Sequence, residues 1–324
     1  MYRSGVQAIN RRFPKLPPIA PDANKYSRGS LLVLAGSRRY SGAGVLATLA
    51  AERTGAGYVS LATPASAAPA ARLHLLCSPV VEAPEDRELG CFAADALPTL
   101  ASQIRRVNAL CCGPGLTVSA ATEAFVKAVV HHAAQKHISL LLDADALNTL
   151  SVEPTLMDER RAQLREAVPQ APDAVRPSPL VLTPHGGELA RLCAAFLPGE
   201  AKGPSLCFTG DTGRREAAQM LAEELGAIIV AKGPTTFIAC DGELYESSEA
   251  TPALAKAGTG DVLAGIISSL LAQGMTAGEA ALLGVQIHSL AGRKAEGRRG
   301  RRSVSALDVI DAISETLGFF EEKR

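Results

Sequence analysis

The sequence predicts an α/β fold with one doubly wound, mostly parallel sheet flanked by helices. The first observation is that short apolar runs alternate along the chain with helical patterns, as in successive βαβ units. The second is the make-up of the apolar runs, which are rich in Leu, Val and Ile and bounded by Gly, Pro, Asp or Thr. Strands that are buried on both faces of a parallel sheet have this composition.

Both kinds of element can be assigned to particular residues. The predicted strands cover residues 30–35, 58–62, 109–112, 139–142, 180–182 and 228–231. The helical patterns between them include residues 45–54, 120–135 and 214–225. Alternation of this kind predicts that the strands form one sheet with helices on its faces.

The last third of the chain has a different pattern. Within residues 235–247, two short runs flank Asp241-Gly242, a dipeptide that favours a two-residue hairpin turn. Apolar residues then recur at helical spacing over 262–271, and Gly274 ends that run. The pair Thr276 and Glu279 has the spacing of a capping box, so we expect the next helix to begin there.

Charge and composition exclude several classes of function. The 324 residues include 33 Lys and Arg and 33 Asp and Glu, so we expect no bulk affinity for nucleic acid or for an anionic membrane. The seven cysteines form no CxxC pair, which favours a reduced cytoplasmic protein. No apolar stretch is long enough to span a bilayer, and the first twenty residues contain no signal-peptide core.

The organisation of the chain is predicted to be simple. Residues 25–324 are expected to form a single domain after an N-terminal extension, residues 1–24. Residues 151–179 carry a charged stretch followed by four prolines, which is typical of a surface insertion. Residues 297–302 hold four arginines, which we interpret as a solvated loop before the last helix.

The most informative motif is Ala257-Gly258-Thr259-Gly260-Asp261, at the start of the apolar helix. Its glycines permit a tight turn, and the free N–H groups and dipole of the helix favour a bound phosphate. The dipole is expected to keep the Asp261 carboxylate ionised, and an ionised carboxylate beside a phosphate could accept a proton from an attacking hydroxyl. The alternative is that Asp261 caps its helix.

A second motif, residues 232–236, follows an apolar strand. A lysine at a strand end, followed by glycine and hydroxyl residues, could hold phosphates by charge and hydrogen bonds. The spacing differs from that of a Walker A loop. A strand-ending turn that leads into the hairpin would explain the same residues.

A third motif, residues 183–188, follows another strand, where the sheet edge is expected to bind ligands. His185 and Glu188 would share one face of a helix that begins here. Glu188 could hold a hydrated Mg²⁺, and His185 could contact a substrate. The alternative is that Glu188 occupies a first helical turn for dipole reasons and that His185 is a satisfied polar residue.

Three further motifs also fall at the predicted carboxyl ends of strands. They are the glycine-rich residues 36–44, Gly113-Pro114-Gly115, and residues 143–148 with the sequence Asp-Ala-Asp-Ala-Leu-Asn. The spacing of the first is not GxGxxG, so it does not predict a dinucleotide-binding fold of that type. The shared position of all these motifs at one sheet edge is the main indication of a site.

As a set, these motifs resemble those of the ADP/ATP-dependent NAD(P)H-hydrate dehydratases. The resemblance runs in family order from about Lys25 to the end, and implies the ribokinase-like fold that this family shares with sugar and vitamin kinases. Two departures are Thr117, where the family commonly has glycine, and the longer segment 151–179. An epimerase domain is often fused to family members, and its absence predicts a stand-alone dehydratase.

The resemblance also implies roles for individual residues. Asp261 would be the catalytic carboxylate and would contact the hydrated nicotinamide nucleotide (NADHX or NADPHX). Glu188 would help to hold Mg²⁺ through water. The remaining substrate-binding residues would be Ala43, Gly115 and His185. The nucleotide, ADP or ATP, would be held by Lys232, Gly233, Pro234, Thr235, Thr236, Gly258, Thr259 and Gly260.

The expected reaction is ADP-dependent dehydration of (S)-NAD(P)H-hydrate to NAD(P)H, with AMP and phosphate as products. ADP is expected because a stand-alone chain without targeting signals resembles the bacterial members, which tend to use it. The family also tends to form tetramers or other homo-oligomers. Two alternatives remain: a small-molecule kinase on the same fold, and a nucleotide-binding regulatory module without catalytic activity.

Overall fold

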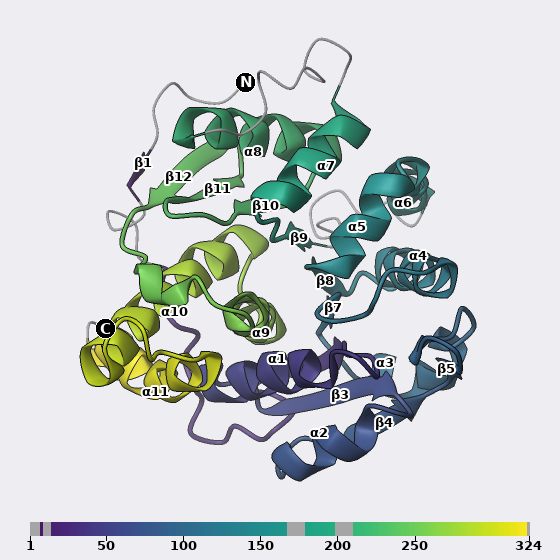
Figure 1. Ribbon diagram of the computed structural model, residues 1–324, viewed down its shortest axis with the longest axis horizontal. Coiled ribbons are helices and arrows are strands. Elements are labelled where there is room, and N and C mark those ends of the chain that lie inside the picture. The colour runs from purple at the N-terminus through teal and green to yellow at the C-terminus, as the bar shows by residue number, and fades with distance from the viewer. Residues whose placement is uncertain (1–6, 9–13, 167–178, 198–209, 323–324) are drawn as a thin grey trace.

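The computed structural model describes residues 7–8, 14–166, 179–197 and 210–322. A ten-stranded sheet forms its centre, with helices on both faces (Figure 1). Its strands are, in spatial order, β4 (Val80–Ala83), β3 (Tyr58–Pro64), β2 (Ser30–Leu34), β7 (Ala109–Cys112), β8 (Ser139–Leu142), β9 (Leu180–Leu182), β10 (Ile228–Ala231), β11 (Thr236–Cys240), β12 (Glu243–Ser247) and β1 (Gln7–Ala8). A separate two-stranded sheet pairs β5 (Glu85–Asp86) with β6 (Cys91–Phe92).

The predicted strands are confirmed. Four of them, β7 to β10, have the predicted bounds, because each is a fully or almost fully buried apolar run between polar or turn residues. All pairs from β4 through β10 are parallel, whereas β11 runs antiparallel to both of its neighbours. The hairpin turn between β11 and β12 places Asp241 at φ 52° and Gly242 at φ 75°, the left-handed pair that a type I′ turn requires.

The order of the strands creates a switch point at β2. From β2 the chain runs outward through β3 and β4, then returns to place β7 on the other side of β2 and continues through β8, β9 and β10. The loops that follow β2 and β7 therefore diverge at the carboxyl edge of the sheet. A crevice at such a position is where doubly wound sheets bind ligands.

Helices on the two faces bury two hydrophobic cores. Side chains of β2 alternate between them, with Leu31 and Val33 in one core and Leu32 and Leu34 in the other. The first core is covered by α1 (Ser41–Thr54), α9 (Thr259–Ala272), α10 (Ala277–Arg299) and α11 (Ala306–Glu322). The second is covered by α4 (Ala120–Gln135), α5 (Asp145–Val152), α6 (Thr155–Glu166), α7 (Gly186–Phe196) and α8 (Asp211–Leu225). The short helices α2 (Ala68–His74) and α3 (Ala101–Ile104) lie near the β3–β4 edge.

Two predicted surface segments are structured where the protein is described. Within the expected insertion, residues 155–166 form α6, which packs on α4 and buries Leu156 and Met157. The proline-rich residues 167–178 lie outside the described residues. From the N-terminal extension, β1 adds an edge strand parallel to β12.

Three of the four arginines of residues 297–302 form salt bridges. Arg298 and Arg299 lie in the last turn of α10, where they pair with Glu315 and Asp308 of α11. Arg301 pairs with Glu296. The first two contacts join the last two helices, so residues 297–299 belong to α10, whereas residues 300–302 form an exposed turn before the last helix, as expected.

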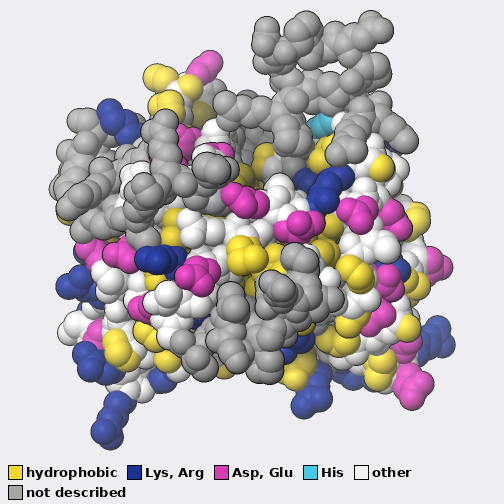
Figure 2. Space-filling model, turned by 90° about the horizontal axis from the view of Figure 1, so that it is seen from above, with side chains coloured by type: hydrophobic (Ala, Val, Ile, Leu, Met, Phe, Trp, Pro, Cys, Tyr) yellow, Lys and Arg dark blue, Asp and Glu magenta, His cyan; other side chains and the backbone are white. Residues whose placement is uncertain are grey.

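Surface charge agrees with the neutral composition. On the face shown in Figure 2, acidic and basic side chains are interspersed. Within the described residues, no helix combines the length and the apolar character needed to cross a membrane.

The apolar helix α9 depends on close contact with α1. A Cβ atom at Gly265 would lie 2.1 Å from the carbonyl oxygen of Ala47, so only glycine allows the two backbones to approach this closely. Ser269 strengthens the contact, since its hydroxyl donates to Ala51 O at 2.9 Å and accepts from Ala56 N at 3.1 Å. This packing fixes the direction in which the first turn of α9 points.

We expect Gly265→Ala to destabilise the protein by roughly 1–3 kcal/mol, because the added methyl forces α1 and α9 apart. Alanine is otherwise the better helix former, so Gly297→Ala on α10 is the matched control. Nothing lies within 4 Å of a Cβ atom at Gly297, and a gain of about 0.5–1 kcal/mol is expected there. Urea unfolding followed by circular dichroism measures both, and equal effects of the two substitutions would contradict the close-contact argument.

Candidate functional site

The sequence motifs meet at the carboxyl edge of the sheet, around the switch point. Lys232, directly after β10, donates its backbone N–H to Pro184 O at 2.8 Å, which places it beside the end of β9. A Cβ atom at Gly260 would lie 3.5 Å from Lys232 Nζ, so the first turn of α9 faces the same lysine. Pro114 O, after β7, accepts from Gly36 N, after β2, at 2.8 Å. Loops from four strands are thereby brought together with one helix.

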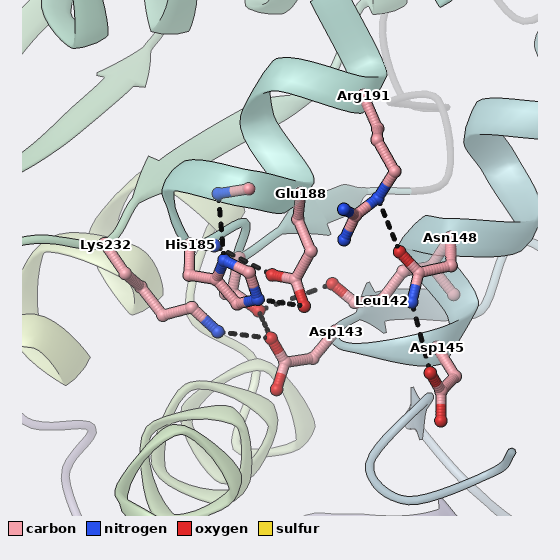
Figure 3. Close-up of polar contacts among 10 residues, drawn as sticks. Leu142, Asp143, Asp145, Asn148, His185, Glu188, Arg191 and Lys232 are labelled. Atoms are coloured by element: carbon pink, nitrogen blue, oxygen red, sulfur yellow. Dashed lines mark hydrogen bonds and ion pairs between the residues drawn. The ribbon is translucent and has the colours of Figure 1, made fainter. Parts of the chain in front are cut away.

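An ion pair between a buried carboxylate and a largely buried lysine lies at the centre of this edge (Figure 3). Lys232 Nζ lies 2.6 Å from Asp143 Oδ1, and the same oxygen accepts from Thr183 Oγ1 at 2.7 Å. Burial disfavours the charged lysine, but the charges of Asp143 and Glu188 outweigh it and hold the pKa of Lys232 above its usual value. Lys232 is therefore a fixed cation at neutral pH.

Asp261 lies in the first turn of α9 but does not cap it. The N-cap is Gly258, at φ 89°, and within the described structure the Asp261 side chain accepts no hydrogen bond. Burial, followed by the charges of Asp143 and Asp145, raises its pKa to about 7, with Lys232 acting in the opposite direction. In the free protein the carboxyl group is therefore only partly ionised near neutral pH, whereas the dipole argument predicts full ionisation.

A half-ionised carboxyl group near neutral pH suits proton transfer in either direction. The helix-cap explanation of Asp261 finds no support in this geometry, because the capping position belongs to Gly258. The neighbouring Thr259 hydroxyl is 2.6 Å from Leu254 O and 2.8 Å from Lys256 O, which fixes the turn in front of the helix. Asp261 is thus placed rigidly and left free to react.

His185 and Glu188 form a capping box at the start of α7. His185 Nδ1 accepts from Gly187 N at 3.0 Å, and Glu188 Oε2 accepts from His185 N at 2.8 Å. The His185 Nε2 atom lies 3.1 Å from Glu188 Oε1, so the neutral tautomer with a proton on Nε2 satisfies both contacts. Burial, then the positive charges of Lys232 and Arg191, lower the pKa of His185.

The alternative explanation, that Glu188 serves the first turn of its helix, is therefore partly right, because Glu188 completes a capping box. Its residue is only 4% exposed, and burial raises the pKa of its carboxyl group. His185, by contrast, keeps 57% of its side-chain surface exposed. Both ring nitrogens of His185 have partners, as the alternative explanation expected, while much of its ring surface stays exposed to solvent.

Ala43 and Gly115, which come from different loops, lie against each other. Gly115 has φ 65°, and a Cβ atom there would be 2.7 Å from Ala43 Cβ. A larger residue at position 115 would therefore clash with Ala43. Two residues further on, Thr117 adopts φ 71°, a left-handed conformation that a β-branched residue rarely takes. Its N–H donates to Asp145 Oδ2 at 2.9 Å, and its hydroxyl is 2.9 Å from that of Ser37.

The loop from Lys232 to Thr236 has partners that the sequence analysis missed. Arg214, on α8, is buried against it and donates to Lys232 O at 3.2 Å. A Cβ atom at Gly233 would lie 1.5 Å from the Arg214 guanidinium, which explains the glycine. Asp211 pairs with Arg214 at 2.5 Å and accepts from Thr235 Oγ1 at 2.9 Å. The spacing of Asp211 and Arg214 at the start of a helix was the available signal.

A second missed residue is His288 on α10. Burial lowers its pKa to about 4, and its ring hydrogen-bonds the backbone of Thr259. A neutral histidine therefore supports the first turn of α9 from the side. No local pattern in the sequence distinguishes it from other residues of an apolar helix.

The sequence of this chain is similar to that of known proteins. A family model of NAD(P)H-hydrate dehydratases matches residues 31–315. The chain is 36% identical over 299 residues to the bifunctional NAD(P)H-hydrate repair enzyme Nnr of Salinibacter ruber, covering 92% of this chain and 49% of that protein. It is 32% identical over 308 residues to the enzyme of the same name from Thermofilum pendens, covering 95% and 53%. The chain thus spans about half the length of these curated relatives.

Solved structures confirm the fold. An ADP/ATP-dependent NAD(P)H-hydrate dehydratase from Bacillus subtilis, co-crystallised with ATP and Mg²⁺, superposes with a TM-score of 0.73 at 24% identity. The alignment covers 98% of this chain and all of that one. A ribokinase-like protein from Enterococcus faecalis gives the same TM-score at 23% identity, covering 99% of this chain and 98% of that one. The predicted ribokinase-like α/β fold is therefore confirmed.

We expect Asp143→Asn to lower the pKa of Asp261, because it removes a neighbouring negative charge that raises this pKa. Asparagine keeps an oxygen that can accept from Thr183 but leaves Lys232 without its charged partner, so circular dichroism first verifies that the variant is folded. Carbon-13 NMR of labelled aspartate carboxyl groups measures the titration, with assignment from Asp261→Asn. The exposed Asp95 is not among the groups that shift Asp261, so Asp95→Asn is the control. An unchanged or higher Asp261 midpoint in Asp143→Asn would refute the electrostatic coupling.

Proposed function

The chain belongs to the NAD(P)H-hydrate dehydratase family, and we propose that it uses ADP or ATP to convert (S)-NAD(P)H-hydrate back to NAD(P)H. With ADP the other products are AMP and phosphate. The observation that carries this proposal is the half-buried carboxyl group of Asp261, which has no hydrogen-bond partner among the described residues and whose pKa of about 7 lets it accept a proton at neutral pH. It lies at the start of a helix whose free N–H groups suit a phosphate.

In the proposed complex the nucleotide lies on the β10 side of the site. Lys232 supplies a fixed positive charge, and the four residues that follow it, Gly233 to Thr236, line the nucleotide. The first turn of α9, with Gly258, Thr259 and Gly260, surrounds the terminal phosphate. The proximity of Lys232 Nζ to Gly260 supports this arrangement, because one phosphate could then contact both.

The hydrated nicotinamide lies on the β2 and β7 side. The contact between Ala43 and Gly115 forms one wall of its site, and the exposed imidazole of His185 forms another. Both ring nitrogens of neutral His185 are engaged, by Glu188 and by Gly187 N, so its exposed ring surface could pack against the substrate. The ring hydroxyl would then face both Asp261 and the terminal phosphate.

The reaction that we propose has two stages. Asp261 takes the proton of the substrate hydroxyl as its oxygen attacks the terminal phosphorus, and the bond from phosphorus to the nucleotide breaks. The ring nitrogen's electron pair then expels phosphate by breaking the carbon–oxygen bond, and loss of a ring proton restores the dihydronicotinamide. Lys232 and the α9 amides stabilise the charge that develops on the transferring group.

Mg²⁺ is expected to enter with the nucleotide and to neutralise phosphate charge. Within the described residues, no three His, Cys, Asp or Glu side chains form a preformed metal cage. This fits Mg²⁺, which keeps several waters and takes few protein carboxylates. Glu188 already accepts from His185 through both oxygens, so its remaining lone pairs suit a metal-bound water rather than direct coordination.

The two alternatives make different products. A small-molecule kinase would leave a phosphorylated hydroxyl compound, and an inactive regulatory module would leave the nucleotide intact. Incubation with NADHX and each nucleotide, while NADH absorbance is followed, separates all three. Oxygen-18 in the substrate hydroxyl should appear in phosphate, and its appearance only in water would exclude the phosphorylated intermediate.

We expect Asp261→Asn to lower kcat by roughly 10²–10⁴-fold, because the base is lost while the shape is kept. Nucleotide affinity should be unchanged or higher, since a negative charge near the phosphates is removed. In the wild type, kcat/KM should rise as the pH rises through about 7, because only the ionised carboxylate accepts the proton. An Asn variant with near wild-type kcat would show that Asp261 is structural, with a stability change of at most about 1 kcal/mol.

We also expect faster turnover with ADP than with ATP, as the resemblance to bacterial members of the family implies. The measurement is kcat/KM for each nucleotide at saturating NADHX, with Mg²⁺ held constant. Equal or faster turnover with ATP would reverse this assignment and leave the dehydration chemistry untouched.

A further inference from the structure

Arg191 is an exposed cation at the site that forms no salt bridge with a described carboxylate, although Glu188 is close enough to interact with its charge. It lies on α7, about one turn beyond Glu188 of the capping box, and its Nε donates to Asn148 Oδ1 at 3.0 Å. Across the described parts of the chain, no Asp or Glu oxygen comes within ion-pair distance of its guanidinium group. Its two terminal nitrogens, each with two N–H donors, form no other hydrogen bond within those parts.

The guanidinium group is nevertheless held in place by a chain of hydrogen bonds. Asn148 donates its amide N–H to Asp145 Oδ1 at 3.1 Å, which fixes its oxygen toward Arg191. Asp145 Oδ2 accepts in turn from Thr117 N at 2.9 Å. Arg191 is thereby connected to the loop after β7, and both Asp145 oxygens are occupied by neutral donors (Figure 3).

Arg191 lies away from Lys232, on whose side of the site we place the nucleotide. Figure 3 shows Lys232 and Arg191 on opposite sides of His185 and Glu188. An Arg191 terminal nitrogen lies 3.7 Å from the position of a Cβ atom at Gly187, so the guanidinium group reaches back toward the start of α7. Its charge contributes to the lowered pKa of His185, the residue that faces the substrate.

We propose that Arg191 binds a phosphate group of the hydrated dinucleotide substrate. The proposal rests on the function proposed above, in which the nicotinamide lies against Gly115, Ala43 and His185. The rest of the dinucleotide must extend away from that contact, and it carries two bridging phosphates, with a third in NADPHX. A planar guanidinium group with two free amino groups matches two phosphate oxygens in a bidentate contact.

The arrangement explains why the guanidinium is held by a neutral partner. A carboxylate at the position of Asn148 would neutralise Arg191 and compete with phosphate, whereas an amide oxygen orients the group and leaves its charge available. Asp145 does not contact Arg191 directly but orients the Asn148 amide that holds it. Arg191 acts in binding and has no part in the proton transfer.

The test compares Arg191→Gln and Arg191→Lys with a matched control, Arg53→Gln. Arg53 is an exposed arginine in the last turn of α1, at the far end of that helix from Ala43. For Arg191→Gln we expect KM for NADHX and NADPHX to rise roughly ten- to a hundredfold, the usual worth of a hydrogen bond between charged groups. kcat, ADP affinity and melting temperature should stay near wild type. Arg191→Lys should fall between Gln and wild type, because it keeps the charge but loses the planar fork.

Comparison of the two substrates identifies the phosphate: equal losses indicate the bridging phosphates, and a loss confined to NADPHX indicates the ribose 2′-phosphate. Unchanged KM for both substrates would overturn the proposal, and so would a loss of ADP affinity instead, which would place Arg191 at the nucleotide. Calorimetric binding of NADPH provides a readout without turnover. If the wild type failed to dehydrate NADHX, the proposed function would fail, while weaker NADPH binding by Arg191→Gln would still support a phosphate contact.

Discussion

The ion pair between Lys232 and Asp143 links the ends of two strands and sets the electrostatics of the whole site. Asp143 is buried and Lys232 is largely buried, and Thr183 from a third strand end also donates to Asp143. Removing either charge would leave the other without its partner in a region of low dielectric. The same Asp143 charge raises the pKa of Asp261, and the same Lys232 charge lowers the pKa of His185. One contact therefore affects the protonation of residues at the starts of two different helices.

The second requirement is that α9 be placed with its first turn toward this ion pair. Its body is buried on nearly all sides, and Gly265 lets it approach α1 more closely than any other residue would. Thr259 and His288 then fix the turn itself. Asp261 consequently receives its position from core packing, while its side chain remains free of hydrogen bonds. A reactive group held by the backbone rather than by its own contacts keeps its proton-accepting capacity.

The site has two cationic sides with a neutral histidine between them. Lys232 lies toward β10 and Arg191 toward the loop after β7, while Glu188 lies behind His185 and holds it in one tautomer. This division suits a reaction between two phosphate-bearing molecules, each of which needs its own counter-charge. Asp145 also connects Thr117 to this arrangement. One of its oxygens accepts from the backbone N–H of Thr117, and the other accepts from Asn148, which in turn orients the guanidinium group of Arg191.

Local sequence determined the strands, the hairpin and the motif glycines, because each depends on short-range pattern or backbone conformation. Strands β7 to β10 are short apolar runs that end where polar or turn-forming residues begin. Asp241-Gly242 strongly favours the left-handed conformations of a two-residue hairpin turn. The motifs at strand ends also predicted one site, because parallel strands end at a common edge. The edge strands β1 and β4 escaped prediction, since weakly apolar segments become strands only when a neighbour supplies hydrogen bonds. Only the tertiary structure decided the protonation of Asp261, the roles of Arg214 and His288, and the orientation of Arg191. Each of these depends on burial and on charges supplied from distant parts of the chain, which no local pattern records.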